Sequence, residues 1–297
     1  MTDTLPITVV IPAWCSEAFL GEALDSVLAQ TRPPGEILVV DDGSPGDETR
    51  EICAARGEAV RYLRKDNGGP ASARNLGVAE SRAEWIAFLD ADDRWQPEKL
   101  ERQWAALQAE PEALLICTEA RLIGGSREGE LRRGGGSPAL DLGSLLAANP
   151  IVTSSVLLQR RAFEEAKGFC EDPALIAVED YDLWLRIAEQ GPLLWLPAPL
   201  VDYRVHASSL SGAERFEKGV ARVLDRALER LPDEARFRSA IRRHRAVLAR
   251  DLAWELLEKG EVVRALRPIL QSVTLTPLSW RSWKLLPKAL SAPFRSA

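Results

Sequence analysis

Five aspartates follow short apolar runs in the first third of the chain, and carboxylates in this setting can hold a divalent cation. Asp41 and Asp42 end the run ILVV, while Asp90, Asp92 and Asp93 end the run WIAFL. Two carboxylates one residue apart after a buried strand, as in DAD, are spaced to share a hard ion with waters and phosphate oxygens. Because magnesium and manganese usually keep only one or two protein carboxylates, such a site needs a phosphate-bearing substrate. The sequence thus predicts metal-assisted chemistry on a phosphorylated compound.

An Asx turn or a helix cap is the simpler interpretation of each aspartate taken alone. It suits Asp41 and Asp42, because Gly43 directly after them supplies a turn. It does not account for two carboxylates at the end of one buried strand. The chain contains no GxGxxG, GxxxxGK[ST], GxSxG or HExxH motif, so dinucleotide, Walker-type, serine-hydrolase and zinc-protease sites are not indicated.

The elements that must position these aspartates alternate between short β-branched runs and longer amphipathic stretches. We predict strands over residues 7–11, 36–41, 59–64, 84–89 and 114–118, and helices over 18–30, 47–56, 70–81 and 97–110. Apolar runs such as ITVVI fit a sheet buried on both faces, and right-handed crossovers make such a sheet parallel. We therefore expect an open α/β sheet whose carboxyl edge collects the residues that follow each strand.

Composition places the chain among folded globular proteins. Its 297 residues are 46% hydrophobic and 28% charged, which fits one large domain or two. The four cysteines form no CxxC pair, which argues against a zinc site or a disulfide framework and favours a reducing, cytosolic compartment. No apolar run of about 18 residues and no secretory signal is present in this sequence. We expect the bulk of the protein to be soluble.

Charge divides the chain into two parts. Net charge is −14 up to Gly212 and +8 after it, which disfavours a nucleic-acid-binding body and leaves the C-terminal part able to meet an anionic surface. Residues 124–138 are rich in glycine and charge and predict a mobile surface loop or an irregular hairpin. Residues 213–297 are mostly an Arg-rich helical pattern. We therefore expect domains over 1–212 and 213–297.

Seven short motifs, in order, carry a resemblance to a known family. They are VVIPAW (9–14), ILVVDDGS (37–44), NGGPASARNLG (67–77), WIAFLDADD (85–93), GF (168–169), VEDYDLWLR (178–186) and YRVH (203–206). In this order and spacing they resemble the GT-A glycosyltransferases of glycosyltransferase family 2. The resemblance implies a GT-A fold, which is a Rossmann-like, mostly parallel open sheet flanked by helices, here with a C-terminal helical extension. It also implies inverting transfer of a sugar from a nucleoside diphosphate donor.

The same resemblance assigns the nucleotide end of the site. Pro12, Ala13, Trp14 and Glu17 would line the base and ribose, and Asp42 would accept a hydrogen bond from the base. An aromatic ring offers a stacking face and a carboxylate can accept from a base edge, so these roles are chemically sensible. Core packing is the alternative for Trp14.

The donor phosphates and metal are assigned by resemblance to residues after the next strands. Arg74 and Asn75 would face the donor, with the arginine on phosphate; a solvated helix face is the alternative. Asp90 and Ala91 would lie near the ribose, and Asp92, with Asp90, would hold Mn²⁺ or Mg²⁺. His206 would supply a further metal ligand, although a lone histidine is usually an ordinary polar residue.

The catalytic base implied by the resemblance is Asp180, which would remove the acceptor hydroxyl proton as the oxygen attacks the anomeric carbon. Acidic residues are common at helix N-termini, so Asp182 is interpreted as structural. The helix dipole would lower the pKa of Asp180, whereas burial and the diphosphate would raise it, and sequence does not rank these effects. His244 lies on the Arg-rich helical pattern, and we expect it to be solvated.

The C-terminal segment 262–297 holds six basic residues and no acidic one, interleaved with Trp280 and Trp283. Such a segment can lie in a membrane interface, or it can pack on the catalytic domain or a second subunit. Pro277, Pro287 and Pro293 would interrupt a long helix, which weakens the membrane interpretation.

The sequence therefore predicts a metal-dependent enzyme that moves a sugar from a UDP-linked donor to a glycan or lipid-linked hydroxyl, in the cytoplasm or at the inner face of the membrane. Two alternatives remain open. One is a non-catalytic sugar-nucleotide or glycan-binding protein on the same scaffold. The other is a sugar-phosphate nucleotidyltransferase, disfavoured because IPAW stands where its Gly-rich loop is required.

Overall fold

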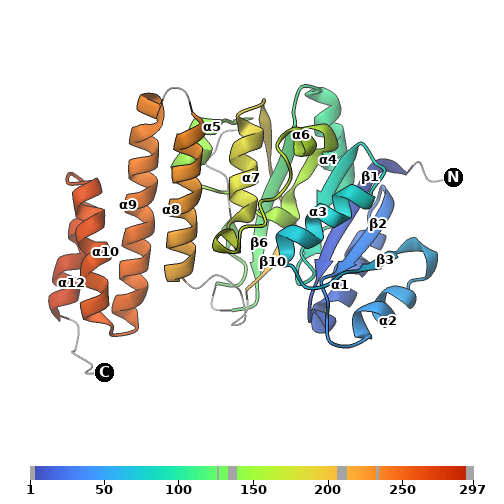
Figure 1. Cartoon of the computed structure of the whole chain (residues 1–297), viewed down its shortest axis with the longest axis horizontal. Helices are drawn as coiled ribbons and strands as arrows, with labels where there is room; N and C mark the ends of the chain where they lie inside the picture. Colours follow the sequence, from blue (N-terminus) through green and yellow to red (C-terminus); the bar gives the residue numbers. More distant parts are fainter. Residues whose placement is uncertain (1–3, 126, 133–138, 206–212, 232–233, 292–297) are drawn as a thin grey trace. The chain divides into compact units, whose positions relative to one another are not determined.

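Apolar, β-branched segments form the strands of one mixed sheet (Figure 1). The computed structural model describes residues 4–125, 127–132, 139–205, 213–231 and 234–291. The strands are β1 (Leu5–Ala13), β2 (Pro34–Asp41), β3 (Arg61–Arg64), β4 (Trp85–Phe88), β5 (Arg94–Trp95), β6 (Leu115–Ile123), β7 (Leu131–Arg132), β8 (Ala139–Leu140), β9 (Leu157–Gln159) and β10 (Leu193–Arg204). The main order is β3-β2-β1-β4-β9-β6-β10-β5, with β7 paired to β6 and β8 paired to β10.

The direction of the strands changes half-way across this sheet. Strands β1 to β4 run parallel, as the crossover argument predicts. The short strand β9 then pairs antiparallel with both β4 and β6, and β10 is parallel to β6. The expected α/β sheet flanked by helices is confirmed, with a mixed rather than uniformly parallel second half. A sequence pattern does not reveal this because β9 is only three residues long.

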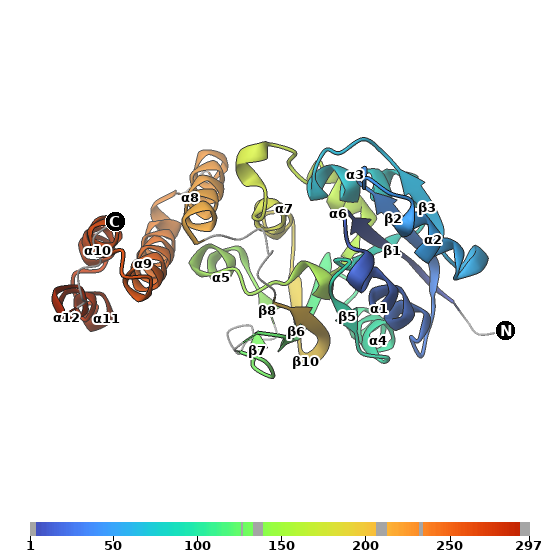
Figure 2. The ribbon, with the colours of Figure 1, turned by 90° about the horizontal axis from the view of Figure 1, so that it is seen from below.

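Helices cover both faces of the sheet. Their bounds are α1 (Glu17–Leu28), α2 (Glu48–Ala54), α3 (Pro70–Glu80), α4 (Lys99–Ala109), α6 (Arg160–Glu165) and α7 (Glu179–Ala188). Figure 2 shows α1 and α4 on one face and α3, α6 and α7 on the other. On the first face, alternate β1 side chains such as Val9 and Ile11 pack in one apolar cluster with Leu20 and Leu24 of α1.

The predicted elements agree with these bounds to within two residues, apart from the end of β6, which continues to Ile123 rather than ending at 118. Residues 57–59 form a 3-10 turn, η1 (Gly57–Ala59), so β3 begins at Arg61 rather than at 59. The described part of 124–138 includes β7, which pairs antiparallel with β6, so an irregular hairpin is present there.

Helix α3 lies directly against β1 because Gly77 carries no side chain. A Cβ at this position would lie 2.3 Å from Cγ1 of Val10, which is closer than atoms can approach. Glycine within a helix costs stability through backbone entropy, and here the cost is offset by close helix-to-strand packing. The contact fixes α3, and therefore the residues at its N-terminal end, against the sheet.

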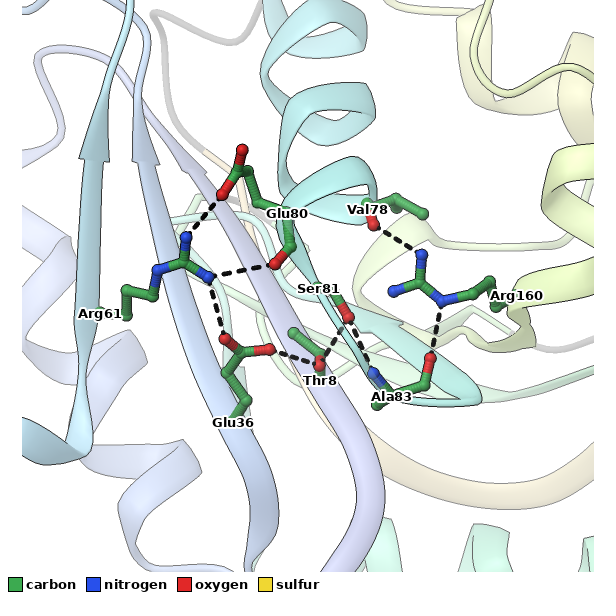
Figure 3. Close-up of polar contacts among 8 residues, drawn as sticks. All are labelled: Thr8, Glu36, Arg61, Val78, Glu80, Ser81, Ala83 and Arg160. Carbon is green, nitrogen blue, oxygen red and sulfur yellow. Dashed lines mark hydrogen bonds and ion pairs between the residues drawn. The ribbon is translucent and has the colours of Figure 1, made fainter.

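A polar network ties the amino ends of the central strands together (Figure 3). The buried Thr8 accepts a hydrogen bond of 2.7 Å from Ser81 and donates one of 2.9 Å to Glu36. Arg61 pairs with Glu36 and with Glu80, at 3.3 and 2.6 Å. These residues come from β1, β2, β3 and the end of α3, so the network holds the edge of the sheet opposite to the ends that carry the aspartates.

The remaining helices belong to a second compact unit, which contains Leu142–Asn149 and Leu210–Ala297, while Met1–Asp141 and Pro150–Ser209 form the first. Its helices are α5 (Leu142–Ala147), α8 (Ala213–Arg230), α9 (Glu234–Glu258), α10 (Val262–Leu275), α11 (Trp280–Trp283) and α12 (Leu285–Ser291). Ala253, Leu256, Ala265 and Ile269 are among the residues that form its core between α9 and α10.

His244 corrects one expectation within this unit. It is buried, and its Nδ1 lies 3.1 Å from the carbonyl oxygen of Leu146 in α5. Burial lowers the pKa of His244 below its usual range, which favours the neutral ring. The expectation of a solvated histidine is wrong because α5, from a distant part of the sequence, packs on α9.

Candidate active site

An exposed tryptophan, Trp14, directly follows the end of β1, and its turn contacts the segment after β2. Ala13 is buried, Pro12 is half-buried and Glu17 is exposed at the start of α1. Trp14 is 57% exposed, so core packing does not explain it. Cys15 follows in a left-handed conformation with φ of 47°, and its backbone N–H donates to the hydroxyl of Ser44 at 3.1 Å. The indole face is therefore held at the surface by a constrained turn.

Asp42 is buried and accepts three hydrogen bonds from the segment before α3. Its Oδ1 accepts from Lys65 Nζ at 2.8 Å and from Gly68 N at 3.0 Å, and its Oδ2 accepts from Gly69 N at 2.7 Å. A carboxylate has about four lone-pair positions, so one further donor can be accommodated. The structure thus gives Asp42 a clear role in shaping the 65–69 segment, in addition to the nucleotide contact expected of it.

The preceding residue, Asp41, forms the turn that sequence analysis attributed to it. Its Oδ1 accepts from Ser44 N at 2.9 Å, and its Oδ2 accepts from Tyr62 Oη at 2.6 Å. Burial raises the pKa of Asp41, but the hydrogen bonds from Tyr62 and Ser44 outweigh it and hold the pKa below its usual value.

The segment after β4 carries three carboxylates in different environments. Asp90 and Asp92 are half-buried, and Ala91 is buried between them. Asp93 is fully buried; it accepts from Ser154 Oγ at 2.6 Å and from Arg204 N at 2.8 Å. Burial, followed by the charges of Asp90 and Asp92, raises the pKa of Asp93 well above its usual range. Three carboxyl groups are therefore crowded at this strand end, and the raised pKa favours the neutral form of Asp93.

Arg74 connects this strand end to α7. Its Nη2 donates to Asp90 Oδ1 at 2.6 Å and its Nη1 donates to Glu179 Oε1 at 2.9 Å. The guanidinium is 6% exposed and lies 5.4 Å above the ring centroid of Phe169. A solvated helix face, the alternative for Arg74, is excluded. Both terminal nitrogens of Arg74 donate hydrogen bonds to carboxylates in this structure.

Asn75 faces the loop that follows α6. Its Nδ2 donates to Phe169 O at 2.9 Å and to Glu171 Oε1 at 2.8 Å, and its Oδ1 accepts from Phe169 N at 2.9 Å. Both backbone polar groups of Phe169 are thus held by one side chain. Asn75 positions the 168–171 loop.

Asp180 lies at the start of α7 with both oxygens oriented. Its Oδ2 accepts from Thr153 Oγ1 of the 3-10 turn η2 (Thr153–Ser155) at 2.8 Å, and its Oδ1 accepts from Tyr181 N at 2.6 Å. Burial, followed by the charge of Glu179, raises the pKa of Asp180 to about 6. Asp180 as a whole residue is half-buried. Asp182, by contrast, is fully buried and pairs with Arg186 at 2.8 Å, as expected of a structural residue.

A small pocket of about 40 Å³ lies between the start of α3 and the loop after α6. It is lined by residues 68–71 and 170–173, Ile176 and Glu179. The pocket therefore includes Glu179, which pairs with Arg74 and directly precedes Asp180 in the sequence.

The carboxylates after β4 suit a hard divalent cation, since Mg²⁺ and Mn²⁺ prefer oxygen ligands. Within the described ranges, no group of three or more His, Cys, Asp or Glu side chains is arranged to hold a metal. Asp90 and Asp92 alone match the one or two carboxylates that magnesium usually takes beside substrate phosphates. His206, the expected third ligand, lies outside the described residues.

Comparison with known proteins decides the family. Residues 8–165 match the family model described as Glycosyl transferase family 2, which is more than half of the chain. The chain belongs to glycosyl transferase family 2. This family 2 chain is 30% identical to an uncharacterized glycosyltransferase of Rickettsia felis over 214 residues, 68% of this chain and 34% of that protein. The match to the succinoglycan biosynthesis protein ExoO of Rhizobium meliloti is 31% over 231 residues, 72% of this chain and 65% of that protein.

The chain spans about a third of the length of the first of these family 2 relatives. Among solved structures, S. aureus TarS 1–349 in complex with UDP-GlcNAc matches with a TM-score of 0.68 at 17% identity, covering 97% of this chain and 89% of that chain. The mannosyltransferase PcManGT of Pyrobaculum calidifontis, in complex with GDP-Man and Mn²⁺, matches with a TM-score of 0.64 at 18% identity, covering 98% and 83%. The expected GT-A fold and the expected membership of glycosyltransferase family 2 are confirmed.

Most of the site residues expected in this family 2 chain gather at the carboxyl ends of the strands. Arg74 pairs with Asp90 and with Glu179, and so connects the end of β4 to the first turn of α7, where Asp180 also lies. Two partners were not singled out from sequence. Glu179 could have been noticed as an acidic residue next to the expected base, whereas nothing in the sequence around Thr153 indicates that it contacts Asp180.

Proposed function

We propose that this chain transfers a sugar from a nucleoside diphosphate donor to a hydroxyl group of a glycan or lipid-linked acceptor, with inversion at the anomeric carbon. The observation that carries the proposal is the shared guanidinium of Arg74. It lies 2.6 Å from Asp90, at the end expected to hold the donor, and 2.9 Å from Glu179, the neighbour of Asp180. A donor-binding carboxylate and a candidate base therefore meet within the reach of one side chain.

In this mechanism Asp180 is the general base. A base must be within hydrogen-bond reach of the proton that it removes and must be ionised at the working pH. Thr153 and the backbone N–H of Tyr181 orient its carboxylate. With a pKa of about 6, Asp180 is mostly ionised at neutral pH yet is a stronger base than an ordinary aspartate. It takes the proton of the acceptor hydroxyl while that oxygen attacks the anomeric carbon and the nucleoside diphosphate leaves from the opposite side.

The nucleotide end of the site has a separate task, which is to hold the donor in place. We assign stacking on the base to the exposed indole of Trp14, beside Pro12, Ala13 and Glu17. Asp42 has capacity for one more hydrogen bond and would accept it from the base. A uracil base suits this arrangement because its imide is a donor. The UDP-GlcNAc in the TarS structure supports a UDP-linked sugar donor. The GDP-Man in the mannosyltransferase structure makes a GDP-linked sugar donor the alternative.

A divalent cation, Mn²⁺ or Mg²⁺, would be held by Asp92 together with Asp90, and His206 is the proposed further ligand. When bound, such an ion neutralises the charge that develops on the leaving diphosphate. The Mn²⁺ in the Pyrobaculum structure supports this assignment. The charges of Asp90 and Asp92 lie close enough to disfavour ionisation of Asp93, which gives a physical reason for a cation to bind there.

The test is a comparison of Asp180→Asn with Asp25→Asn, which removes the same charge from an exposed position on α1. With UDP-, GDP- and dTDP-sugars and Mn²⁺, we expect Asp180→Asn to bind donor normally and to lose roughly a hundredfold or more in transfer rate. Asp25→Asn should match the wild type. Full transfer by Asp180→Asn would reject the assigned base.

Product analysis in the same assays tests the reaction class. Release of a nucleoside diphosphate supports glycosyl transfer, and release of pyrophosphate would instead indicate a nucleotidyltransferase. Donor binding without turnover across a broad acceptor panel would favour a non-catalytic binding protein. The name of the Rhizobium relatives, succinoglycan biosynthesis proteins, supports a glycan as acceptor and a role in polysaccharide biosynthesis of the cell envelope.

We also propose a peripheral contact with the membrane through the C-terminal helical unit, at its cytoplasmic face. Along α10, Val263, Leu266 and Leu270 are exposed on one stripe, and exposed large side chains continue at Leu278, Trp280 and Trp283. The nearby cations Arg267, Arg281 and Lys284 are exposed and have no carboxylate partner within the described residues. Tryptophan and basic side chains together favour an anionic lipid surface. None of the helices in the described part of the chain is long and apolar enough to cross a bilayer.

Flotation with vesicles tests this contact. We expect the protein to float with vesicles of phosphatidylglycerol and phosphatidylcholine, less with phosphatidylcholine alone, and less at high salt. Replacing Trp280 and Trp283 together by serine should abolish flotation and leave donor turnover on a soluble acceptor unchanged. Equal flotation by the variant would contradict the proposed contact.

A further inference from the structure

Glu179 is a buried acid that the proposed mechanism does not use directly. Its side chain is 5% exposed, one oxygen pairs with Arg74, and the other, Oε2, is buried without a hydrogen-bond partner. An unsatisfied buried carboxylate oxygen costs stability, because the hydration that it loses on folding is not replaced. Helix dipoles favour acids at this position, but they do not require a buried one. The ion pair with Arg74 accounts for one oxygen of Glu179, and the buried Oε2 has no structural explanation.

The position of Glu179 places a negative charge beside Asp180. The two residues are adjacent in the first turn of α7. Among the described residues, the groups that act on the Asp180 carboxylate are Glu179 and the backbone N–H of Tyr181 from α7, Arg74 from α3 and Thr153 from η2. Glu179 opposes ionisation of Asp180, while the other three favour it. Arg74 is itself shared, because its second nitrogen is held by Asp90.

We propose that Glu179 and Arg74 form a positioning pair for Asp180. The buried carboxylate of Glu179 makes Asp180 a stronger base. The guanidinium of Arg74 limits this effect and connects the pair to Asp90, at the donor end of the site. The inference rests on the proposed function of Asp180. Neither residue of the pair needs to touch the reacting atoms. Their opposite charges predict opposite consequences of removing each one, which a merely structural role does not.

The experiment is the pH dependence of kcat and kcat/KM for the wild type and two variants. For Glu179→Gln we expect the acidic limb to move to lower pH by about 0.5–1 unit, because the nearby negative charge is gone. The plateau rate should fall several-fold because a weaker base transfers the proton less well. For Arg74→Gln we expect the acidic limb to move to higher pH. Arg74→Lys, which keeps the positive charge, should return the limb toward its wild-type position.

Asp182→Asn is the matched control, since it removes the same charge from the same turn of α7 and breaks the ion pair with Arg186. It should lower thermal stability and leave the limb where it is. The pair is refuted if Glu179→Gln changes the plateau rate without moving the limb, or if Asp182→Asn moves the limb equally. Should Arg74→Gln not fold, the comparison of Glu179→Gln with Asp182→Asn still decides the question.

The outcome is separable from the test of the proposed function. If Asp180→Asn keeps full activity, the assigned base is wrong and the limb cannot be attributed to it. If Asp180→Asn is inactive and Glu179→Gln leaves the limb unmoved, the base stands and only the positioning pair fails.

Discussion

Thr153 Oγ1 donates a hydrogen bond of 2.8 Å to Asp180 Oδ2, which connects a 3-10 turn before β9 to the first turn of α7. The two residues are 27 positions apart in the sequence. The bond selects one orientation of the carboxylate and stabilises its ionised form.

The first prediction concerns this hydrogen bond. Wild-type activity should rise through an acidic limb near pH 6, because Asp180, with a pKa raised to about 6, must lose its proton to act as a base. Thr153→Val removes a donor that lowers the pKa of Asp180, so the limb should move to higher pH. The same bond orients the carboxylate, and its loss should lower kcat about tenfold because the base is less well placed. Thr118→Val, at another buried threonine, is the control and should keep the wild-type limb. An unchanged limb in Thr153→Val would show that the bond does not act on the base.

The second prediction concerns nucleotide affinity. Base stacking on an aromatic side chain is worth about 1–3 kcal/mol, so Trp14→Ala should raise the Kd for the nucleoside diphosphate by about 5- to 150-fold. Because Trp14 is 57% exposed, its truncation should leave Tm within about 2 °C of the wild type. Calorimetric titration with UDP and GDP measures the change. Trp254→Ala, at an indole that is 48% exposed in the other unit, should bind nucleotide normally.

The third prediction concerns Lys99, which is fully buried. Its Nζ donates to Gln103 Oε1 at 2.7 Å and lies 3.9 Å from the ring centroid of Trp95. Burial lowers the pKa of Lys99 well below its usual value, so the unfolded chain binds the proton more readily than the folded one. Folding stability is therefore lost, through this group, as pH falls below the ordinary lysine pKa toward the folded value.

Lys99→Met removes that dependence. As pH falls from 10 to 7, the free energy of unfolding of Lys99→Met should increase relative to that of the wild type, by up to about 1.4 kcal/mol per pH unit. Urea unfolding at several pH values measures it. Lys218→Met, at an exposed lysine, provides the baseline, and parallel pH curves for Lys99→Met and the wild type would contradict the prediction.

The fourth prediction concerns the network at the amino edge of the sheet (Figure 3). Thr8→Val removes the hydrogen-bond acceptor of Ser81 and the donor to Glu36 Oε2, while Glu36 keeps Arg61 and Ser81 still accepts from Ala83 N. The free energy of unfolding should fall by about 1–3 kcal/mol. Since the network lies at the edge opposite to the aspartates, kcat should not change. A large loss of kcat in a fully folded Thr8→Val variant would show that the two edges are coupled.

Much of the first half of the sheet, from β1 to β4, could be predicted from the hydrophobic periodicity of the sequence alone. The run ITVVI and the turn residues after ILVV place β1 and β2, and the ends of these strands bring Trp14 and Asp42 to one edge. Local sequence is sufficient here because each strand is directly followed by its crossover helix.

The rest depends on contacts between distant segments. The antiparallel β9 is too short to show a pattern, and the burial of His244 depends on α5, nearly a hundred residues earlier. Arg74 could be expected near the donor from its motif. Its pairing with Glu179, 105 residues away, is a property of the folded chain and has no local signal.

The contact between Gly77 and Val10 bears on how variants of this chain should be interpreted. A methyl group at Gly77 would push α3 off the sheet and displace Arg74, one turn earlier in the same helix, from its two carboxylates. In a mutational scan scored on activity, Gly77 would consequently rank with the active-site residues, although it has no side chain with which to reach a substrate. Abundance measured alongside activity would separate such misplaced-helix variants from those that unfold.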